Sequence, residues 1–320
     1  MPCLLLLLSA MVSHGCGEEP TADHAPSAAQ TLRALESIEH LLDAGKNAEA
    51  LRAAESLQRA QPLDALTAEM LARARMAAHC EPALVADAYA RAAELAPASP
   101  GLASVAGITA AAAQRWPEAL QYQLHAAQLQ PGNPQHALQL AAAYRALGQP
   151  HDALLASQRA VALAPLDASV QLSLAQSLVA LDAFPHARAA ALRAFTSNPR
   201  DAALRVAVAN VLREAQGATE AINMIQLDAA RTDAAPAAIE SLARAQESAG
   251  LPALAAENWQ RLAGAPLASS QPCLEAARCL VLDSQHDAAR EWLARARERG
   301  ASSASIAMIE KLLPALPSPK

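Results

Sequence analysis

Large aromatic side chains are scarce in this sequence of 320 residues, which contains three Trp, three Tyr and two Phe. A core built around large rings is therefore excluded, and abundant alanine instead favours helices that approach closely through small side chains. Basic residues are fewer than acidic ones, and the net charge of −6 argues against nucleic acid as a partner. Motifs of catalysis are missing too, since there is no His-Glu-x-x-His, no phosphate-binding loop and no Gly-x-Ser-x-Gly. The sequence thus predicts a helical protein that is not an enzyme and holds no cofactor.

The apolar run at residues 4–12 is too short to cross a bilayer and has the length of a signal-peptide core. The run is followed by Ser13-His14-Gly15-Cys16, which resembles a bacterial lipoprotein signal, where a peptidase cuts before a cysteine that is joined to diacylglycerol. Gly15 and Cys16 match that pattern, whereas Ser13 and His14 depart from it and no basic residue precedes the run. The resemblance implies a signal peptide over 1–15 and lipid on Cys16. The alternative is an apolar N-terminus on a cytoplasmic protein.

Residues 16–30 follow as a stretch rich in Ala, Pro, Glu and Ser, with little apolar surface to bury. Such a composition is typical of a flexible linker. We expect this segment to be a tether between a membrane and a folded body.

A small side chain recurs every 34 residues at two places in the sequence. The first series is Gly107, Ala141, Ala175, Ala209, Ala243 and Ala277, and the second is Ala119, Ala153, Ala187, Ala221, Ala255 and Ala289. A fixed period of this length indicates a repeat architecture, in which each repeat is one supersecondary unit.

Each 34-residue unit predicts two amphipathic helices with a short turn between them. In the unit 134–167, the first helix runs from Gln135 to Leu147 and ends at Gly148, and the second runs from His151 to Leu163. The residues that precede first helices and suit N-caps are Asp64, Asp167 and Asp201. Proline closes the units at the same interval, at Pro97, Pro131, Pro165 and Pro199.

This pattern resembles the tetratricopeptide repeat family, which carries small residues at positions 8, 20 and 27 of its motif and proline at 32. The two series above occupy positions 8 and 20, and Ala92, Ala126, Ala160 and Ala194 occupy position 27. A larger side chain at position 8 or 20 would push the helices of a hairpin apart. The resemblance implies an all-α, right-handed superhelical solenoid of antiparallel helix hairpins, with about eight repeats. We assign the solenoid to 31–303, a capping helix to 304–313 and a disordered tail to 314–320.

Two units depart from the motif. The spacing from Pro62 to Pro97 is 35 residues, so the second unit carries an insertion. The unit 202–235 has Asp228 and Asp233 where the motif has alanine and proline, which predicts a loosened second helix near 226–235.

In this family the first helices line a concave groove, and the resemblance assigns groove positions to this chain. The partner-binding residues it implies are Leu138, Arg145, Leu172, Gln176, Asn210, Arg213, Arg244 and Arg278. Such a groove suits a helix or extended peptide with apolar contacts and a carboxylate. The alternative is that the arginines are solvated or paired with neighbours such as Glu240 and Glu247. Family members that grip the C-terminal carboxylate of chaperones use paired lysines, which this groove lacks.

Cysteine and histidine provide no further site. Cys273 and Cys279 lie six residues apart on one predicted helix, hence on different faces, and cannot pair with each other. The histidines near the starts of second helices, His151, His186 and His286, have no cysteine or carboxylate at ligand spacing, so we expect no metal.

The resulting hypothesis is a lipoprotein of the bacterial cell envelope, at the outer membrane or periplasmic face. Its solenoid would bind a peptide or helix of a partner protein and serve in assembly of an envelope complex. The alternatives are a cytoplasmic adaptor or regulator without lipid and, more remotely, an enzyme or small-ligand receptor that uses the groove.

Overall fold

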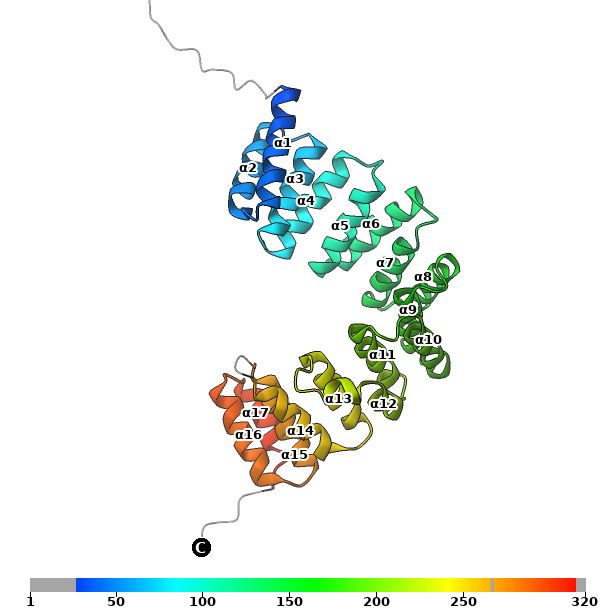
Figure 1. Ribbon diagram of the computed structural model, residues 1–320, viewed down its shortest axis with the longest axis vertical. Helices are drawn as coiled ribbons and strands as arrows, with labels where there is room; N and C mark the ends of the chain where they lie inside the picture. The colour runs from blue at the N-terminus through cyan, green and yellow to red at the C-terminus, as the bar shows by residue number, and fades with distance from the viewer. Residues whose placement is uncertain (1–26, 266–267, 315–320) are drawn as a thin grey trace, which may run out of the picture. The chain divides into compact units, whose positions relative to one another are not determined.

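The structure is a computed structural model that describes residues 27–265 and 268–314. The predicted signal peptide, Cys16 and most of the tether and tail therefore lie outside the described residues. In the described ranges every regular element is a helix, and there are seventeen of them (Figure 1). The predicted fold, an all-α solenoid of helical hairpins, is confirmed.

The helices alternate between first and second members of eight hairpins. The first helices are α1 (Ala28–Asp43), α3 (Ala65–Ala77), α5 (Pro100–Ala112), α7 (Pro134–Ala146), α9 (Ala168–Val179), α11 (Ala202–Glu214), α13 (Pro236–Ser248) and α15 (Gln271–Leu282). The second helices are α2 (Asn47–Ala60), α4 (Pro82–Leu95), α6 (Trp116–Leu129), α8 (Pro150–Leu163), α10 (Phe184–Ser197), α12 (Ala218–Ala229), α14 (Pro252–Ala263) and α16 (His286–Glu298). A last helix, α17 (Ser303–Glu310), contacts α15 and α16. The chain divides between Leu95 and Ala96 into two compact units, α1–α4 and α5–α17.

Side chains that accept hydrogen bonds fix where several first helices begin. Asp64, Asp167 and Asp201 accept bonds from backbone N–H groups of the first turns of α3, α9 and α11, as predicted. These bonds satisfy donors that a helix start leaves without partners. Ser27 does the same for α1, which therefore includes residues 28–30 that the sequence assigned to the tether.

The turn within each hairpin contains one residue with positive φ. Gly148 has φ of 69°, and the next residue, Gln149, donates its backbone N–H to the carbonyl of Tyr144 at 2.8 Å. This left-handed cap ends a helix while satisfying its last carbonyls. Equivalent residues in five other turns are not glycine, namely His79, Gln114, Asp182, Gln216 and Ser284. Helix pairing thus imposes the turn conformation even where the side chain disfavours it.

The twelve small residues of the two 34-residue series are all buried. Ala141 on α7 and Ala153 on α8 have no exposed surface. Gly107 is the one glycine of the series, because a Cβ there would lie 2.8 Å from Cγ of buried Gln123 on α6. Small side chains therefore occupy the closest approaches between paired helices.

Both predicted irregular units differ from the fourth hairpin. The insertion of the second unit lies in the turn 78–81, which has four residues where the turn 147–149 of the fourth hairpin has three. In the sixth hairpin, α12 ends at Ala229 after 12 residues, whereas α6, α8 and α10 each have 14. Helix α12 is intact over 226–229, and residues 230–235 lead to α13 without helical structure, so the loosening predicted near 226–235 is found only after Ala229.

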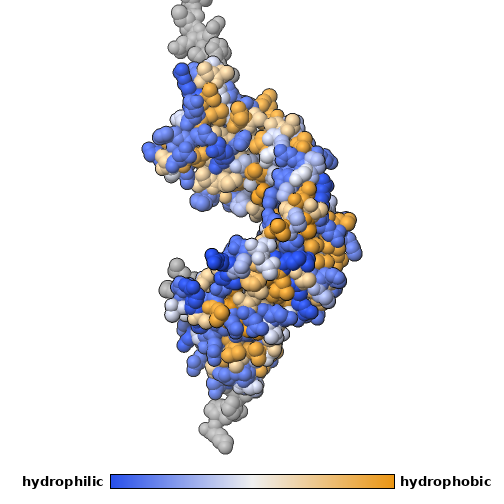
Figure 2. Space-filling model, turned by 45° about the vertical axis from the view of Figure 1, so that its right-hand side comes forward, coloured by the Kyte–Doolittle hydropathy of each residue, from blue (hydrophilic) through white to orange (hydrophobic). Residues whose placement is uncertain are grey.

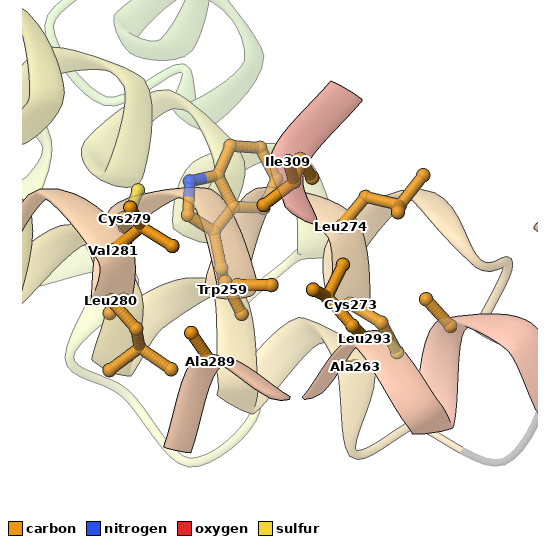
Figure 3. Packing of buried hydrophobic residues seen from close by; sticks show 14 of the residues in the cluster. Trp259, Ala263, Cys273, Leu274, Cys279, Leu280, Val281, Ala289, Leu293 and Ile309 are labelled. Atoms are coloured by element: carbon orange, nitrogen blue, oxygen red, sulfur yellow. The ribbon is translucent and has the colours of Figure 1, made fainter. Parts of the chain in front are cut away.

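Large apolar side chains gather towards the end of the second unit. One cluster joins α13–α17 around Trp259 of α14, which lies among side chains of α15 (Figure 3). Another centres on Leu212 and Ile225 of the sixth hairpin. The end of the solenoid is therefore held by a more conventional apolar core than the alanine contacts alone provide.

Candidate interaction surface

First helices of the second unit pack directly against one another. Contacts join α5 to α7, α7 to α9, α9 to α11 and α11 to α13, whereas each second helix packs between the first helices on either side of it. Because the first helices lie closer together, they form the inner side of the stack. We call this surface of α5, α7, α9, α11, α13 and α15 the first-helix wall.

The structure places all eight predicted groove residues on first helices, α7 to α15. Seven of them are half-buried, and Arg244 is exposed. The leucines Leu138 and Leu172 pack partly against buried clusters and leave the rest of their surface open. Apolar and hydrophilic residues are interspersed over the visible surface of the molecule (Figure 2).

Hydrogen bonds between neighbouring first helices connect residues that are 31 positions apart. Arg145 of α7 donates to Gln176 of α9 at 2.9 Å, and Ser241 of α13 donates to Asn210 of α11 at 3.0 Å. Farther along, Arg278 of α15 donates to Glu247 of α13. Four of the predicted groove residues thus have bonds that hold the wall together.

Arg145 also contacts a group of buried serines. Its Nη1 donates to the hydroxyls of Ser173 and Ser177 at 3.0 and 3.1 Å, and Ser177 shares a 2.8 Å hydrogen bond with Ser157 of α8. All of these partners are neutral. Burial lowers the pKa of the Arg145 guanidinium, although arginine remains charged at any physiological pH.

Glu247 is the centre of a second polar group, whose donors come from α14 and α15. It accepts hydrogen bonds from the Trp259 indole at 2.5 Å, from the Arg278 guanidinium and from the Cys279 thiol at 3.2 Å. Burial and then the Glu247 charge raise the pKa of Cys279 to about 12. Burial alone would lower the pKa of Arg278, but its bonds to Glu247 and Glu275 outweigh that effect and raise it. Cys279 is therefore an inert thiol at neutral pH.

Two hairpins after Arg145 and Gln176, the equivalent positions of the repeat hold Arg213 on α11 and Arg244 on α13. Both places hold an arginine here, and each of the two arginines is paired with a carboxylate of its own helix. Arg213 contacts Glu214 at 3.1 Å, and Arg244 contacts Glu240 at 2.9 Å while its guanidinium lies over Trp259. In the absence of a partner, Arg213, Arg244 and Arg278 are therefore paired with neighbouring carboxylates, which is the alternative to partner binding given above.

Neither the serine group nor the role of Trp259 follows from the sequence pattern. Isolated serines on a helix, such as Ser157, Ser173 and Ser177, form no periodic pattern of their own. Their neighbours lie 16 to 32 residues away, so a signal exists only once the helix register is known.

Other features of the described residues add no site. Among them no group of three His, Cys, Asp or Glu side chains is placed to hold a metal ion. Cys80, Cys273 and Cys279 are free thiols. No helix in the described ranges is both long and apolar enough to span a bilayer.

Comparison with known proteins supports the fold. No protein-family model and no curated protein sequence matches this chain. Among solved structures, a tetratricopeptide repeat protein from Parabacteroides merdae is similar with a TM-score of 0.54 and 14% identity, over 88% of this chain and 98% of that one. PilW, described as a widely conserved type IV pilus biogenesis factor, is similar with a TM-score of 0.56 and 16% identity, over 66% of this chain and 98% of its own. The fold of this chain is that of tetratricopeptide repeat proteins.

Proposed function

We propose that this chain is a non-enzymatic scaffold that binds a peptide or helix of a partner protein along the first-helix wall. The observation that carries the proposal is the direct packing of α5, α7, α9, α11 and α13 into one continuous surface. Half-buried leucines and arginines on it offer apolar contacts and charge to a ligand.

We further propose that Cys16 is lipidated and tethers the scaffold to the bacterial cell envelope, where it serves in assembly of an envelope complex. The sequence around Cys16 supports the lipid, and the similarity in fold to PilW, a pilus biogenesis factor, is consistent with an assembly role. A cytoplasmic adaptor without lipid is the second candidate, since the same wall would serve it equally.

Site-specific photo-crosslinking tests the binding surface. A photoreactive amino acid would replace Gln176 on the wall, and in a matched variant it would replace Gln158, which is exposed on the second helix α8. We expect a discrete crosslinked protein in the native cell from position 176 and none from position 158. Crosslinking from position 158 alone would move the interface to the second helices.

Mass spectrometry of the mature N-terminus tests the lipid. We expect a chain that begins at Cys16 with a diacylglycerol mass added, and release of Cys16→Ala from the membrane fraction. An intact Met1 contradicts the lipoprotein and leaves the cytoplasmic adaptor.

A further inference from the structure

Arg145 is a charged residue in a part of the wall that has no acidic residue. The first helices α5, α7 and α9 contain no Asp and no Glu, and Arg145 is the only Lys or Arg among them. On the same two helices as Arg145 and Gln176, Leu138 of α7 and Leu172 and Val179 of α9 are apolar and half-buried.

The hydrogen bonds of Arg145 fix its guanidinium without compensating its charge. Three acceptors face Nη1, and Nη2 donates to Gln176. A guanidinium has five N–H donors, so these contacts leave Nε and one hydrogen of Nη2 for a further acceptor. Side-on pairing of a carboxylate with these two groups is the usual bidentate geometry of arginine.

The other arginines of the wall differ from Arg145 in this respect. Arg213 contacts Glu214, Arg244 contacts Glu240, and Arg278 contacts Glu247 and Glu275. The pair Glu247–Arg278 stands at the same places on α13 and α15 as Arg145 and Gln176 on α7 and α9. In the described chain, the C-terminal pair is therefore neutral and the central pair carries a positive charge.

A half-buried charge without a counter-ion is unfavourable, and a partner that supplies the counter-ion removes that cost. Resting on the scaffold function proposed above, we infer that the wall of α7 and α9 binds a partner segment in which an aspartate or glutamate side chain is flanked by apolar residues. The carboxylate pairs with Arg145, and the apolar residues pack on Leu138, Leu172 and Val179.

The test is selection of peptides from a random library displayed on phage as N-terminal fusions, so that every acidic group is a side chain. The full chain is the target, and Arg145→Gln and Arg159→Gln serve as parallel targets, since Arg159 is exposed on the second helix α8 and lies outside the wall. We expect sequences selected on the unchanged chain and on Arg159→Gln to be enriched in Asp or Glu beside apolar residues, and those selected on Arg145→Gln to lack that enrichment.

A double-substitution cycle then separates charge recognition from a structural role of Arg145. An amidated synthetic peptide of the most enriched sequence is compared with its copy in which the acidic residue is replaced by the amide. Binding to the unchanged chain should weaken about tenfold in the copy, as loss of a charge-assisted pair predicts. Both peptides should bind Arg145→Gln alike, whereas Arg159→Gln should keep the tenfold difference.

The outcomes distinguish the two proposals. Selected peptides that lose binding on Leu172→Asp but carry no acidic preference would overturn the role of Arg145 and leave the scaffold function standing. A tenfold preference that persists in Arg145→Gln would overturn it as well. If no sequence is enriched on any target, both the recognition of a carboxylate and the binding of peptides by the wall are wrong.

Discussion

The central hairpins, α5–α10, and the later hairpins, α11–α16, keep one helix order but fill it differently. The position that faces the small residue of the first helix is Gln123, Ser157 and Ala191 in the central hairpins and Ile225, Trp259 and Leu293 in the later ones. All six side chains are buried. The same architecture therefore accepts a small or polar residue in one region and a large apolar residue in the other.

Changes at the helix ends accompany this difference in packing. Second helices of the central hairpins have 14 residues, whereas α12 and α14 have 12, with longer connections to the next hairpin. Where the facing residue is small or polar, the second helices keep one length. Where that residue is large and apolar, as in the sixth and seventh hairpins, the second helix is shorter and the connection after it is longer.

The feature common to both regions is the close contact of small residues, and breaking it should have the largest effect. Ala141→Leu puts three extra carbon atoms where there is no exposed surface, between α7 and α8. We expect the free energy of unfolding to fall by about 3 kcal/mol, the upper part of the range for overpacking. Ala142→Leu, one residue along on the partly exposed wall, is the control and should be nearly neutral. Urea denaturation followed by circular dichroism measures both, and equal effects would contradict close packing as the basis of the period.

Glu247 tests the polar group of the later hairpins. Glu247→Gln removes the charge that pairs with Arg278, while Glu275 keeps one contact to that arginine. Because the Glu247 side chain is only 20% exposed, we expect a loss of about 2 kcal/mol in the free energy of unfolding. The matched variant Glu240→Gln breaks an exposed pair and should cost under about 1 kcal/mol. Similar losses in the two variants would show that Glu247 is an ordinary surface carboxylate.

The period and the caps could be predicted from sequence because each depends on neighbours within one repeat. The recurrence of Ala141 and Ala153 predicts that both are buried, and Asp167 caps the helix that follows it directly. The hydrogen bonds between neighbouring first helices could not be predicted in this way. Arg145 and Gln176 belong to different hairpins, as do Glu247 and Arg278, and each pair meets only because of how consecutive hairpins are aligned. Both pairs are 31 residues apart, three fewer than the period, and this spacing becomes visible only when two neighbouring repeats are compared.

The glycine of the central hairpins allows a rescue experiment. Gly107→Ala gains about 1 kcal/mol of helix propensity but brings a Cβ within 3.0 Å of Gln123, so overpacking should outweigh the gain by about 1 kcal/mol. In the double variant Gly107→Ala with Gln123→Ser, the pair becomes the Ala141 and Ser157 of the next hairpin. We expect the double variant to have a higher urea midpoint than Gly107→Ala alone. A double variant no better than the single one would mean that Gln123 is not what requires glycine.

The smallest effect concerns the ion pair that replaces alanines in the sixth hairpin. Arg205 of α11 and Asp228 of α12 make two hydrogen bonds, of 2.6 and 2.9 Å, at places where the fourth hairpin has Ala137 and Ala160. Asp228→Ala alone leaves Arg205 without its carboxylate partner, though not without its bond to the Pro199 carbonyl, and should cost about 1 kcal/mol. Arg205→Ala with Asp228→Ala restores the alanine pair and should be close to neutral.

The pH dependence gives this pair a second, independent readout. The hydrogen bonds from Arg205 lower the pKa of Asp228 in the folded chain. A carboxyl whose folded pKa is depressed contributes stability that is present above its unfolded pKa, about 4, and is lost as the pH falls through the folded pKa. The two chains should therefore be about equally stable at neutral pH, and the unchanged chain should lose stability relative to the double alanine variant as the pH falls below about 4. A difference that is the same at pH 7 and pH 3 would show that the ion pair adds nothing beyond the contact that two alanines make in the fourth hairpin.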